Sequence, residues 1–449
     1  MQGDAGRGPD AGAAGKVTLL VGNGAREART EVLRLAELLA APMVLTLKAK
    51  EGFEGDNPYQ VGQTGLIGNP AAAHALDHCD TLVMLGTDFP YRDWYPTGCT
   101  VVQIDTREEH LGRRIPLDAG LTGDVGATLR ALIPLLQPVD KQSHLEESRG
   151  KYVDWHEGQQ RLAEPGHDRK GFGQLRAALD NRDRDVRPEA LAAAVDRYAD
   201  DDAVFTSDTG MATVWLSRFV SMHGNRRVLG SYNLGSMANA MPQALGAQLW
   251  APDRQVVAFC GDGGLSMLLG DLMTIETYRL PVKLVVFDNR RLGMVKLEQE
   301  QSGLAEFGTE LDNPDFAAVA TALGLTGIRI TDPADLHQGI QRAFATPGAG
   351  PAGRPDQPAG DRRARQAHRC PGMGLRHRQN QGEPPEPRQL RRTPWGAGEV
   401  PVRQGQPATQ PCYRKRRRGV TAASRRRWPV GRRLQRAGSM TSLRSMSWS

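Results

Sequence analysis

The sequence predicts an α/β protein with two doubly wound parallel-sheet domains, followed by an irregular basic tail. Three observations support this prediction. Short apolar, β-prone runs alternate with helical patterns in two separate blocks. The strand runs are continuously apolar, which is typical of parallel strands buried on both faces. Apolar periodicity then stops near Pro347, so the second block ends there.

The first block starts at Val17, after a small, polar, Gly-rich leader that we expect to be disordered. The segment "AREARTEVLRLAELLA" has apolar residues three and four apart and predicts a helix, and "DVGATLRALIPLL" predicts the helix that closes the block. Apolar runs that end in glycine or polar turns predict the strands: "VTLLVGNG", "PMVLTL", "TLVMLGT" and "TVVQID".

The second block follows a polar, charged segment that we expect to be partly helical. It opens with the helical pattern "RPEALAAAVDRYA", which has Pro188 in its first turn, and closes with a helix that starts near Asp332. The expected division of the chain is a leader at 1–16, a central domain at 17–137, a connecting segment at 138–186, a second domain at 187–346 and a tail at 347–449.

Charge divides the chain in the same way. Residues 347–449 hold 23 Lys and Arg against 5 Asp and Glu, which leaves 34 basic and 46 acidic residues in the rest. The body is therefore acidic, like an ordinary soluble enzyme. The five cysteines form no CxxC pair, and no apolar run approaches the ~20 residues of a membrane span. We expect free thiols and a cytoplasmic protein, peripheral to the inner membrane at most.

The tail has two interpretations. Its arginine clusters, such as "RKRRRG", could bind nucleic acid through phosphate charge alone. A shifted reading frame in a GC-rich gene fits better, because such frames produce Arg, Pro and Gly without a folding pattern. We expect no specific nucleic-acid partner.

The chemistry centres on two strand ends. The runs Val256–Cys260 and Val282–Phe287 flank a helix expected at 265–278, and such a β-α-β unit makes the two strands parallel. Asp262 and Asn289 follow the two runs and should lie at one edge of the sheet, where α/β proteins bind ligands. Their carboxylate and amide oxygens suit Mg²⁺.

Glycines surround this acid. Gly261, Gly263 and Gly264 would let backbone N–H groups approach a phosphate at the start of the next helix. The alternative is that Gly-Asp-Gly and Asp-Asn are two ordinary turns. The paired placement at two strand ends favours the binding site.

These residues resemble the thiamine diphosphate motif, in which GDG is followed after 24 residues by a pair that ends in Asn; here that pair is Asp288-Asn289. The resemblance implies that Mg²⁺ binds Asp262, Asn289 and the backbone carbonyl of Arg291, and that Gly263 and Gly264 approach the diphosphate. The segment "NLGSMANAMPQALGAQ" resembles the family loop at the thiazolium and aminopyrimidine, where Gly235, Ser236 and Met237 map. Without the family, an apolar core residue is the favoured interpretation of Met237.

Longer segments resemble the pyruvate dehydrogenase (quinone), or pyruvate oxidase, family: "DNPYQVGQTGLIG", "GTDFPYRDWYP", "GDGGLSMLLGDL" and "LPVKLVVFDN". The likeness runs from about Val17 to Ala345. In that family the central domain binds FAD, which implies contacts from Thr64, Gly65, Leu66, Ile67, Thr87, Asp88, Phe89, Pro90, Tyr91 and Asp105. Asp105 also ends a strand, where an acid can accept ribose hydroxyls or simply cap a turn.

The family reaction is thiamine diphosphate- and Mg²⁺-dependent oxidative decarboxylation of pyruvate to acetate and CO₂, with electrons passing through FAD to a quinone. Leu292, Gly293, Met294 and Val295 would cover the active centre. The family glutamate that activates the cofactor has no counterpart here, so we nominate no catalytic residue and expect activity to be doubtful.

Two alternatives follow from the same resemblance. The chain could be an acetolactate synthase-like 2-keto acid carboligase, which shares the cofactors, or a non-catalytic fragment. The segments "FPYRDWYP" and "GSMANAMPQALG" favour the oxidase. The resemblance also implies a homo-oligomer, a tetramer in the family, whereas the family's C-terminal membrane-binding segment has no counterpart in this sequence.

Overall fold

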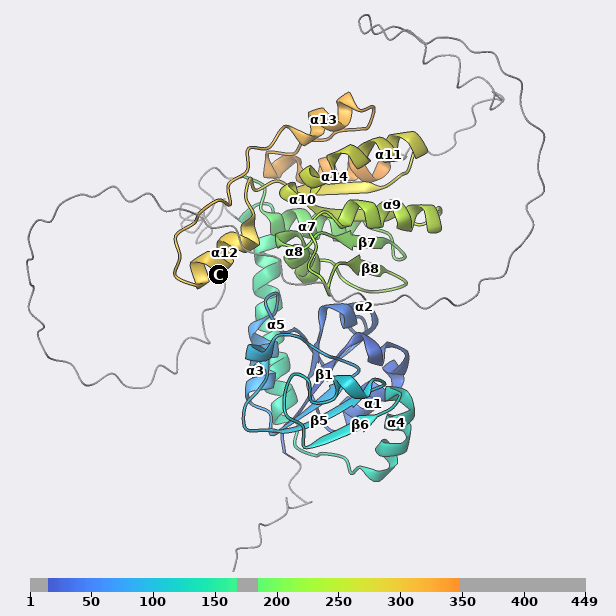
Figure 1. The fold of residues 1–449 in the computed structure, drawn as a ribbon, viewed down its shortest axis with the longest axis vertical. Coiled ribbons are helices and arrows are strands. Elements are labelled where there is room, and N and C mark those ends of the chain that lie inside the picture. The colour runs from blue at the N-terminus through green and yellow to red at the C-terminus, as the bar shows by residue number, and fades with distance from the viewer. Residues whose placement is uncertain (1–14, 168–184, 347–449) are drawn as a thin grey trace, which may run out of the picture. The chain divides into compact units, whose positions relative to one another are not determined.

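The computed structural model describes residues 15–167 and 185–346, and these contain two parallel β-sheets (Figure 1). The expectations for residues 1–14 and for the tail at 347–449 lie outside the described residues. Within them, the predicted α/β class with doubly wound parallel sheets is confirmed.

The first sheet has the strand order β3-β2-β1-β4-β5-β6, and all its pairs are parallel. Its strands are β1 Val17–Val21, β2 Met43–Leu45, β3 Gln60–Gln63, β4 Thr81–Leu85, β5 Thr100–Asp105 and β6 Ala119–Thr122. Its helices are α1 Arg29–Leu38, α2 Lys50–Phe53, α3 Pro70–Asp77 and α4 Val125–Leu132. The order reverses between β1 and β4, which is the switch point where such sheets bind ligands.

The second sheet has the order β10-β9-β7-β8 and is also parallel. Its strands are β7 Val204–Ser207, β8 Arg227–Gly230, β9 Val256–Gly261 and β10 Lys283–Phe287. Its helices are α7 Pro188–Tyr198, α8 Met211–Phe219, α9 Ala240–Trp250, α10 Asp262–Met267, α11 Leu272–Tyr278, α12 Gly293–Gln301, α13 Phe316–Ala322 and α14 Leu336–Ala345. The long helix α5, Ser143–Ala163, lies in the segment that we expected to be partly helical.

Both faces of the second sheet are buried. Along β9, Val257 and Phe259 pack into one apolar cluster with α7, α8 and α14, whereas Val256, Ala258 and Cys260 pack into another with α9, α10 and α11. This two-sided burial explains why the strand is a continuous apolar run rather than an alternating one.

The helix expected at 265–278 is wrong in its bounds. It starts earlier, at Asp262, and is interrupted between Met267 and Leu272 by a 3₁₀ turn that contains Gly270. Glycine weakens a helix, and Leu268 leaves the helical region of backbone space. Strands β3, β6 and β8 were not predicted, because they are short and lack an apolar run; β6 is exposed along its whole length.

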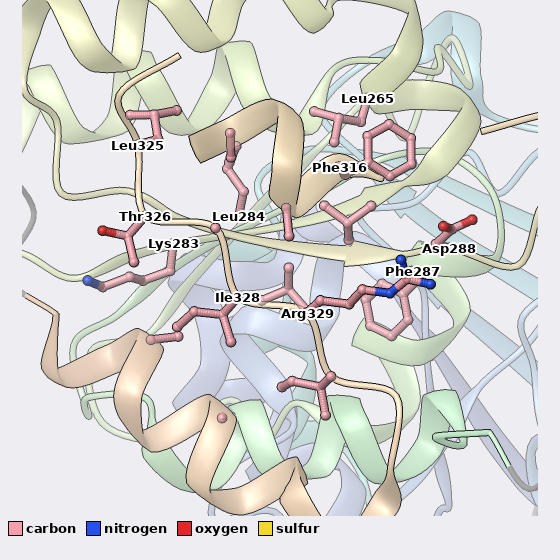
Figure 2. A pocket seen from close by; sticks show the side chains of 18 of the residues that line it. Leu265, Lys283, Leu284, Phe287, Asp288, Phe316, Leu325, Thr326, Ile328 and Arg329 are labelled. Atoms are coloured by element: carbon pink, nitrogen blue, oxygen red, sulfur yellow. The ribbon is translucent and has the colours of Figure 1, made fainter. Parts of the chain in front are cut away.

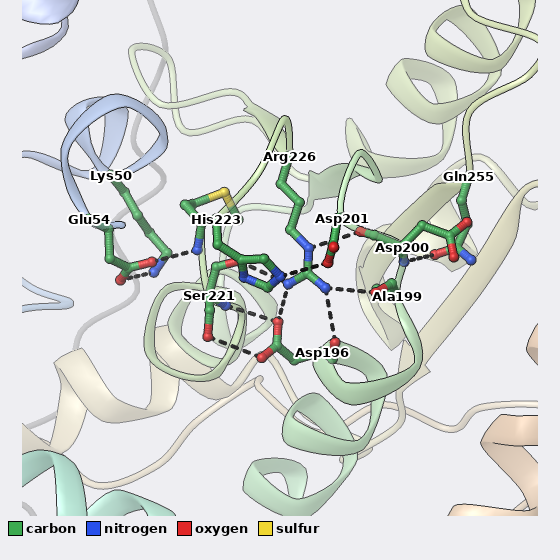
Figure 3. Close-up of polar contacts among 11 residues, drawn as sticks. Lys50, Glu54, Asp196, Ala199, Asp200, Asp201, Ser221, His223, Arg226 and Gln255 are labelled. Carbon is green, nitrogen blue, oxygen red and sulfur yellow. Dashed lines mark hydrogen bonds and ion pairs between the residues drawn. The ribbon is translucent and has the colours of Figure 1, made fainter. Parts of the chain in front are cut away.

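A buried arginine holds the start of the second domain together (Figure 3). Arg226 is only 4% exposed and donates to the Asp196 carboxylate at 2.6 Å. It also donates to the carbonyls of Ala199 at 2.7 Å, Asp200 at 2.9 Å and Ser221 at 2.9 Å. The rigid guanidinium fork therefore ties the end of α7 to the loops that lead into β7 and β8.

Candidate functional site

Three strands of the second sheet end at one edge. Parallel pairing places Phe287 of β10 beside Gly261 of β9, and Phe259 of β9 beside Ser207 of β7. Asp262 and Asp288 therefore begin adjacent loops, as the β-α-β argument predicts.

Asp262 is buried, at 3% exposure, at the first position of α10. Its Oδ1 accepts from its neighbour's amide, Gly263 N, at 2.9 Å, and its Oδ2 accepts from Asn313 Nδ2 at 2.8 Å. Burial raises the pKa of this carboxyl and nearby Asp288 raises it further, while the hydrogen bonds act in the opposite direction. A positive ligand would offset the same desolvation cost.

Asn289 and Arg291 form a tight turn after β10. The side-chain oxygen of Asn289 accepts from Arg291 N at 3.0 Å, and Arg290 between them adopts a left-handed conformation. Arg291 and Glu310 also form an isolated antiparallel β-bridge. The two backbone hydrogen bonds of this β-bridge are made by the Arg290 carbonyl and the Leu292 amide. The Arg291 carbonyl is not used by the bridge, which suits the ligand role implied by the resemblance.

Asn313 belongs to the same site and was missed by sequence reasoning. Its Nδ2 donates to Asp262 at 2.8 Å and to Asp288 at 2.7 Å, so one amide group joins two carboxylates. Two acids directed at one donor make a position that attracts positive charge. No local signal in the sequence marks Asn313, which reaches the site from a distant loop.

Asp208, at the end of β7, was also missed. It is 2% exposed; its Oδ1 accepts from Ala240 N at 2.9 Å and its Oδ2 from Gly261 N at 3.2 Å. Burial raises the pKa of this carboxyl. Asp208 therefore joins the start of α9 to the glycine turn after β9. The strand-end rule that selected Asp105 would have selected Asp208 as well.

The glycines of the GDG turn lie in close packing. A Cβ on Gly263 would meet the side chains of Leu292, Met237 and Leu311 at 3.0–3.3 Å. Met237 and Leu292 thus both lie against the turn. The turn sits at the start of α10, where backbone N–H groups point outward.

The other residues of the predicted loops surround this turn. Gly235 has a left-handed conformation and donates its N–H to the Ser231 carbonyl at 2.7 Å, and exposed Ser236 donates its hydroxyl to the Met237 carbonyl at 3.0 Å. Gly293 starts α12, with Met294 and the 43% exposed Val295 after it. A Cβ on Gly293 would lie 2.9 Å from Asn289 Nδ2.

The donor set fits Mg²⁺ bound to a diphosphate. It offers one carboxylate, one amide oxygen and one carbonyl, all hard oxygen ligands. In this structure the carboxylates of Asp262 and Asp288 share one neutral amide donor. Their combined negative charge supports the binding of a cation at this point. The described residues contain no group of three or more His, Cys, Asp or Glu side chains that could hold a metal.

The residues proposed to contact FAD lie at the corresponding edge of the first sheet. Thr64 and Gly65 follow β3, Thr87 follows β4 and Asp105 ends β5. A Cβ on Gly65, which has φ +95°, would meet the Phe89 ring at 3.0 Å. The remaining members are the buried or half-buried Ile67 and Asp88 and the exposed Leu66, Pro90 and Tyr91.

Three observations bear on the fit of this second edge. Among the described residues, Thr64 Oγ1 is a buried hydroxyl without a hydrogen-bond partner, as expected where a ligand would supply one. Asp88, by contrast, is held by Arg114 through two hydrogen bonds at 2.8 and 3.1 Å. Asp105 accepts from Arg107 N at 2.9 Å, so it also caps its turn.

Sequence reasoning missed the glycines at the switch point of this sheet. A Cβ on Gly22 would lie 2.3 Å from the Gly86 carbonyl, and one on Gly86, at φ +58°, would lie 2.4 Å from Gly24. The "GNG" turn after β1 and the turn after β4 are therefore in close backbone contact. The closeness of Gly-Asn-Gly to a strand end was the signal available in the sequence.

Within residues 15–167 and 185–346, no helix combines the length and apolar character that crossing a membrane requires.

Comparisons with known proteins agree with the two-domain arrangement. The model of the thiamine pyrophosphate enzyme central domain matches residues 12–132, and that of the C-terminal thiamine pyrophosphate-binding domain matches residues 208–352. Thiamine pyrophosphate is thiamine diphosphate under another name.

Full-length relatives show the same likeness. The YdaP protein of Bacillus subtilis is 34% identical over 329 residues, which cover 73% of this chain and 54% of the relative. Acetolactate synthase isozyme 2 large subunit of Escherichia coli is 32% identical over 327 residues, which cover 70% and 55%. An acetolactate synthase of Mycobacterium bovis is 32% identical over 348 residues, which cover 74% and 54%. The chain spans about half the length of these curated relatives.

Proposed function

The chain belongs to the thiamine pyrophosphate enzyme family, and we propose that it holds the cofactor's diphosphate through Mg²⁺ at the ends of β9 and β10. The observation that carries this proposal is the pair of carboxylates, Asp262 and Asp288, directed at a single donor. Asp262, Asn289 and the Arg291 carbonyl would be the protein ligands of the metal.

Each surrounding residue then has a physical task. Gly263 and Gly264, at the start of α10, would present N–H groups to phosphate oxygens. Asp208 holds the turn that carries these glycines. Met237 and Leu292 pack against the turn and would exclude water on the side of the thiazolium.

The bound cofactor would stabilise the carbanion left when a 2-keto acid loses CO₂. We propose pyruvate as this 2-keto acid and FAD as a second cofactor, held by the strand ends of the first sheet. The orphaned hydroxyl of Thr64 and the glycine contacts at Gly22 and Gly86 support a ligand there. Electron transfer to a quinone, and a homotetramer, rest on the sequence resemblance alone.

A second candidate reaction is the carboligation catalysed by acetolactate synthases. It is supported by the names of the relatives from Escherichia coli and Mycobacterium bovis, and it is at least as well founded as pyruvate oxidation. Both reactions would use the same diphosphate site. Incubation with pyruvate separates them: acetolactate indicates carboligation, whereas acetate formed together with reduction of a quinone analogue indicates oxidation.

The site itself is tested by titration calorimetry of the chain with thiamine diphosphate and Mg²⁺. We expect binding that needs both components and that Asp262→Ala reduces at least ~tenfold, because a buried metal ligand is lost. Asp253→Ala, which removes an exposed carboxylate from a turn of the same domain, is the matched control. Equal binding by wild type and Asp262→Ala would contradict the proposed ligand set. Absence of binding in wild type would favour the non-catalytic interpretation.

A further inference from the structure

The turn proposed to bind the metal carries a positive side chain that has no task in the site described so far. Strand β10 ends at Phe287, and Asp288 follows it at the end of the strand (Figure 2). The metal-ligand turn, residues 289–291, comes next, and we have proposed the carbonyl of Arg291 as a ligand. The guanidinium of the same residue is a permanent positive charge. Its position therefore matters to any cation that binds in this turn.

A free guanidinium in the turn would oppose the metal in two ways. It would repel Mg²⁺ directly, because like charges at short range raise the energy of binding. It would also compete for the diphosphate, because arginine binds phosphate oxygens through paired N–H groups. A site that holds a diphosphate through Mg²⁺ thus requires the guanidinium of Arg291 to be held elsewhere.

Two glutamates from loop 302–315, which joins α12 to α13, hold this guanidinium. Arg291 Nη1 forms one ion pair with Glu306 and a second with Glu310 Oε1 at 3.1 Å. The side chain of Glu306 is 26% exposed, whereas that of Glu310 is 79% exposed. Water and salt screen the more exposed pair more strongly. Glu306 is therefore the main partner of the guanidinium.

Two further donors hold Glu306 in place. Thr309, which is 1% exposed, donates its hydroxyl to Glu306 Oε1 at 2.5 Å. Lys296 Nζ, on α12, lies 3.5 Å from the other oxygen, Oε2. Both oxygens of the carboxylate are thus engaged by the loop and by α12. These contacts fix the position of the acid that receives the guanidinium.

The backbone of the same loop clamps the metal-ligand turn. Leu292 N, directly after the turn, donates to the Thr309 carbonyl at 2.8 Å. Leu311 N donates to the Arg290 carbonyl at 2.9 Å. Loop 302–315 therefore holds the turn through its backbone and the guanidinium of Arg291 through its acidic side chains.

We propose that Glu306 is a positioning residue that keeps the guanidinium of Arg291 away from the metal, so that Arg291 offers its carbonyl oxygen and not its charge. This inference rests on the proposed function, because it assigns a task within the Mg²⁺–diphosphate site. It names a determinant of metal dependence. With Glu306 in place the diphosphate is bound through Mg²⁺, and without it the arginine binds phosphate directly.

Titration calorimetry of the full chain with thiamine diphosphate, at a series of Mg²⁺ concentrations, tests the inference. In Glu306→Gln we expect the Mg²⁺ concentration for half-maximal binding to rise about threefold, since ion pairs at partly exposed sites are individually weak. Binding without Mg²⁺, measured in the presence of a chelator, should become stronger than in the wild type. Glu300→Gln is the matched control and should behave as the wild type, because Glu300 also lies near Lys296, at 3.6 Å, but forms no ion pair with Arg291.

The double variant Glu306→Gln/Arg291→Gln separates charge from packing. It removes the guanidinium but keeps the backbone carbonyl, so it should regain the wild-type dependence on Mg²⁺ to within about twofold. A double variant as impaired as Glu306→Gln would mean that Glu306 only supports the fold of the loop, and would overturn the inference. An unchanged Mg²⁺ dependence in Glu306→Gln would overturn it as well. If the wild type binds no thiamine diphosphate at any Mg²⁺ concentration, the proposed function fails, and the inference fails with it.

Discussion

The carboxylate of Asp208 lies against Gly264, where a Cβ would come within 2.2 Å of its Oδ2. Asp208 ends β7 and Gly264 lies in α10, so this contact joins two loops of the proposed diphosphate site. The same carboxylate accepts from the Gly261 and Ala240 amides. The acid therefore fixes the position of the glycine turn rather than facing the cofactor itself.

Gly264→Ala should disturb this arrangement. The added methyl group meets a buried carboxylate that is already held by two amides, so the turn must shift. We expect a loss of about 1–3 kcal/mol in the free energy of unfolding, typical of overpacking, and weaker binding of thiamine diphosphate. Urea denaturation and calorimetry measure the two effects.

Gly261→Ala is the matched control in the same turn. A Cβ at Gly261 meets nothing within 4 Å, and its backbone is extended, so alanine fits. We expect stability close to that of the wild type. Equal losses in both variants would show that the turn is sensitive to any substitution and that the Asp208 contact is not the cause.

Asn313→Leu should expose the repulsion between the two carboxylates that this amide joins. Without the donor, Asp262 and Asp288 face each other uncompensated, and we expect the chain without metal to lose about 1–3 kcal/mol. If Mg²⁺ binds here, adding Mg²⁺ and thiamine diphosphate should recover more stability in the variant than in the wild type. Thermal melts with and without Mg²⁺ measure this, and a variant that Mg²⁺ stabilises no more than wild type would place the metal elsewhere.

The sequence was sufficient to predict the class of fold and to predict that Asp262 lies at the same sheet edge as the Asp288–Asn289 turn. Both follow from local pattern, because two buried strands around a helix must be parallel. It was not sufficient for Asn313, whose role depends on a loop that returns to the sheet edge from outside the β-α-β unit. Long-range returns of this kind leave no periodic signal.

Short elements show the same limit. Strand β6 is formed by "AGLT", which is exposed and carries no strand pattern, yet it pairs with β5 in register. Pairing with an existing edge decides its structure, and intrinsic propensity does not. The break after Met267 likewise depends on how α10 and α11 pack, although Gly270 was a visible signal.

Arg226→Met should destabilise the second domain strongly. The variant removes the buried guanidinium that donates to the half-buried Asp196 carboxylate and to the carbonyls of Ala199 and Ser221, while Asp196 keeps its hydrogen bonds from Ser221. We expect a loss of about 3–5 kcal/mol by urea denaturation. Arg226→Lys keeps the charge but not the planar fork, so its loss should be intermediate. A lysine variant as unstable as the methionine variant would mean that geometry, and not charge, accounts for the whole effect.

His144 should make stability depend on pH. It is buried on α5, and its Nε2 lies 2.9 Å from Thr18 Oγ1. That hydroxyl donates its only proton to the Ala75 carbonyl at 2.7 Å, so it must accept from the histidine, which therefore carries a proton on Nε2. Burial first, and nearby Lys16 next, lower the pKa of His144 from 6.5 to about 4.

The sign follows from proton binding. Between pH 6.5 and about 4 the unfolded chain binds a proton at His144 that the folded chain does not. The stabilisation is therefore complete above pH 6.5 and is lost as the pH falls toward 4, by about 3 kcal/mol in all. His144→Gln can still donate to Thr18 but does not titrate, so its unfolding free energy should fall less across this window. Denaturant titrations at several pH values measure the free energy of unfolding. If this free energy changes with pH equally in wild type and His144→Gln, a buried neutral histidine is contradicted.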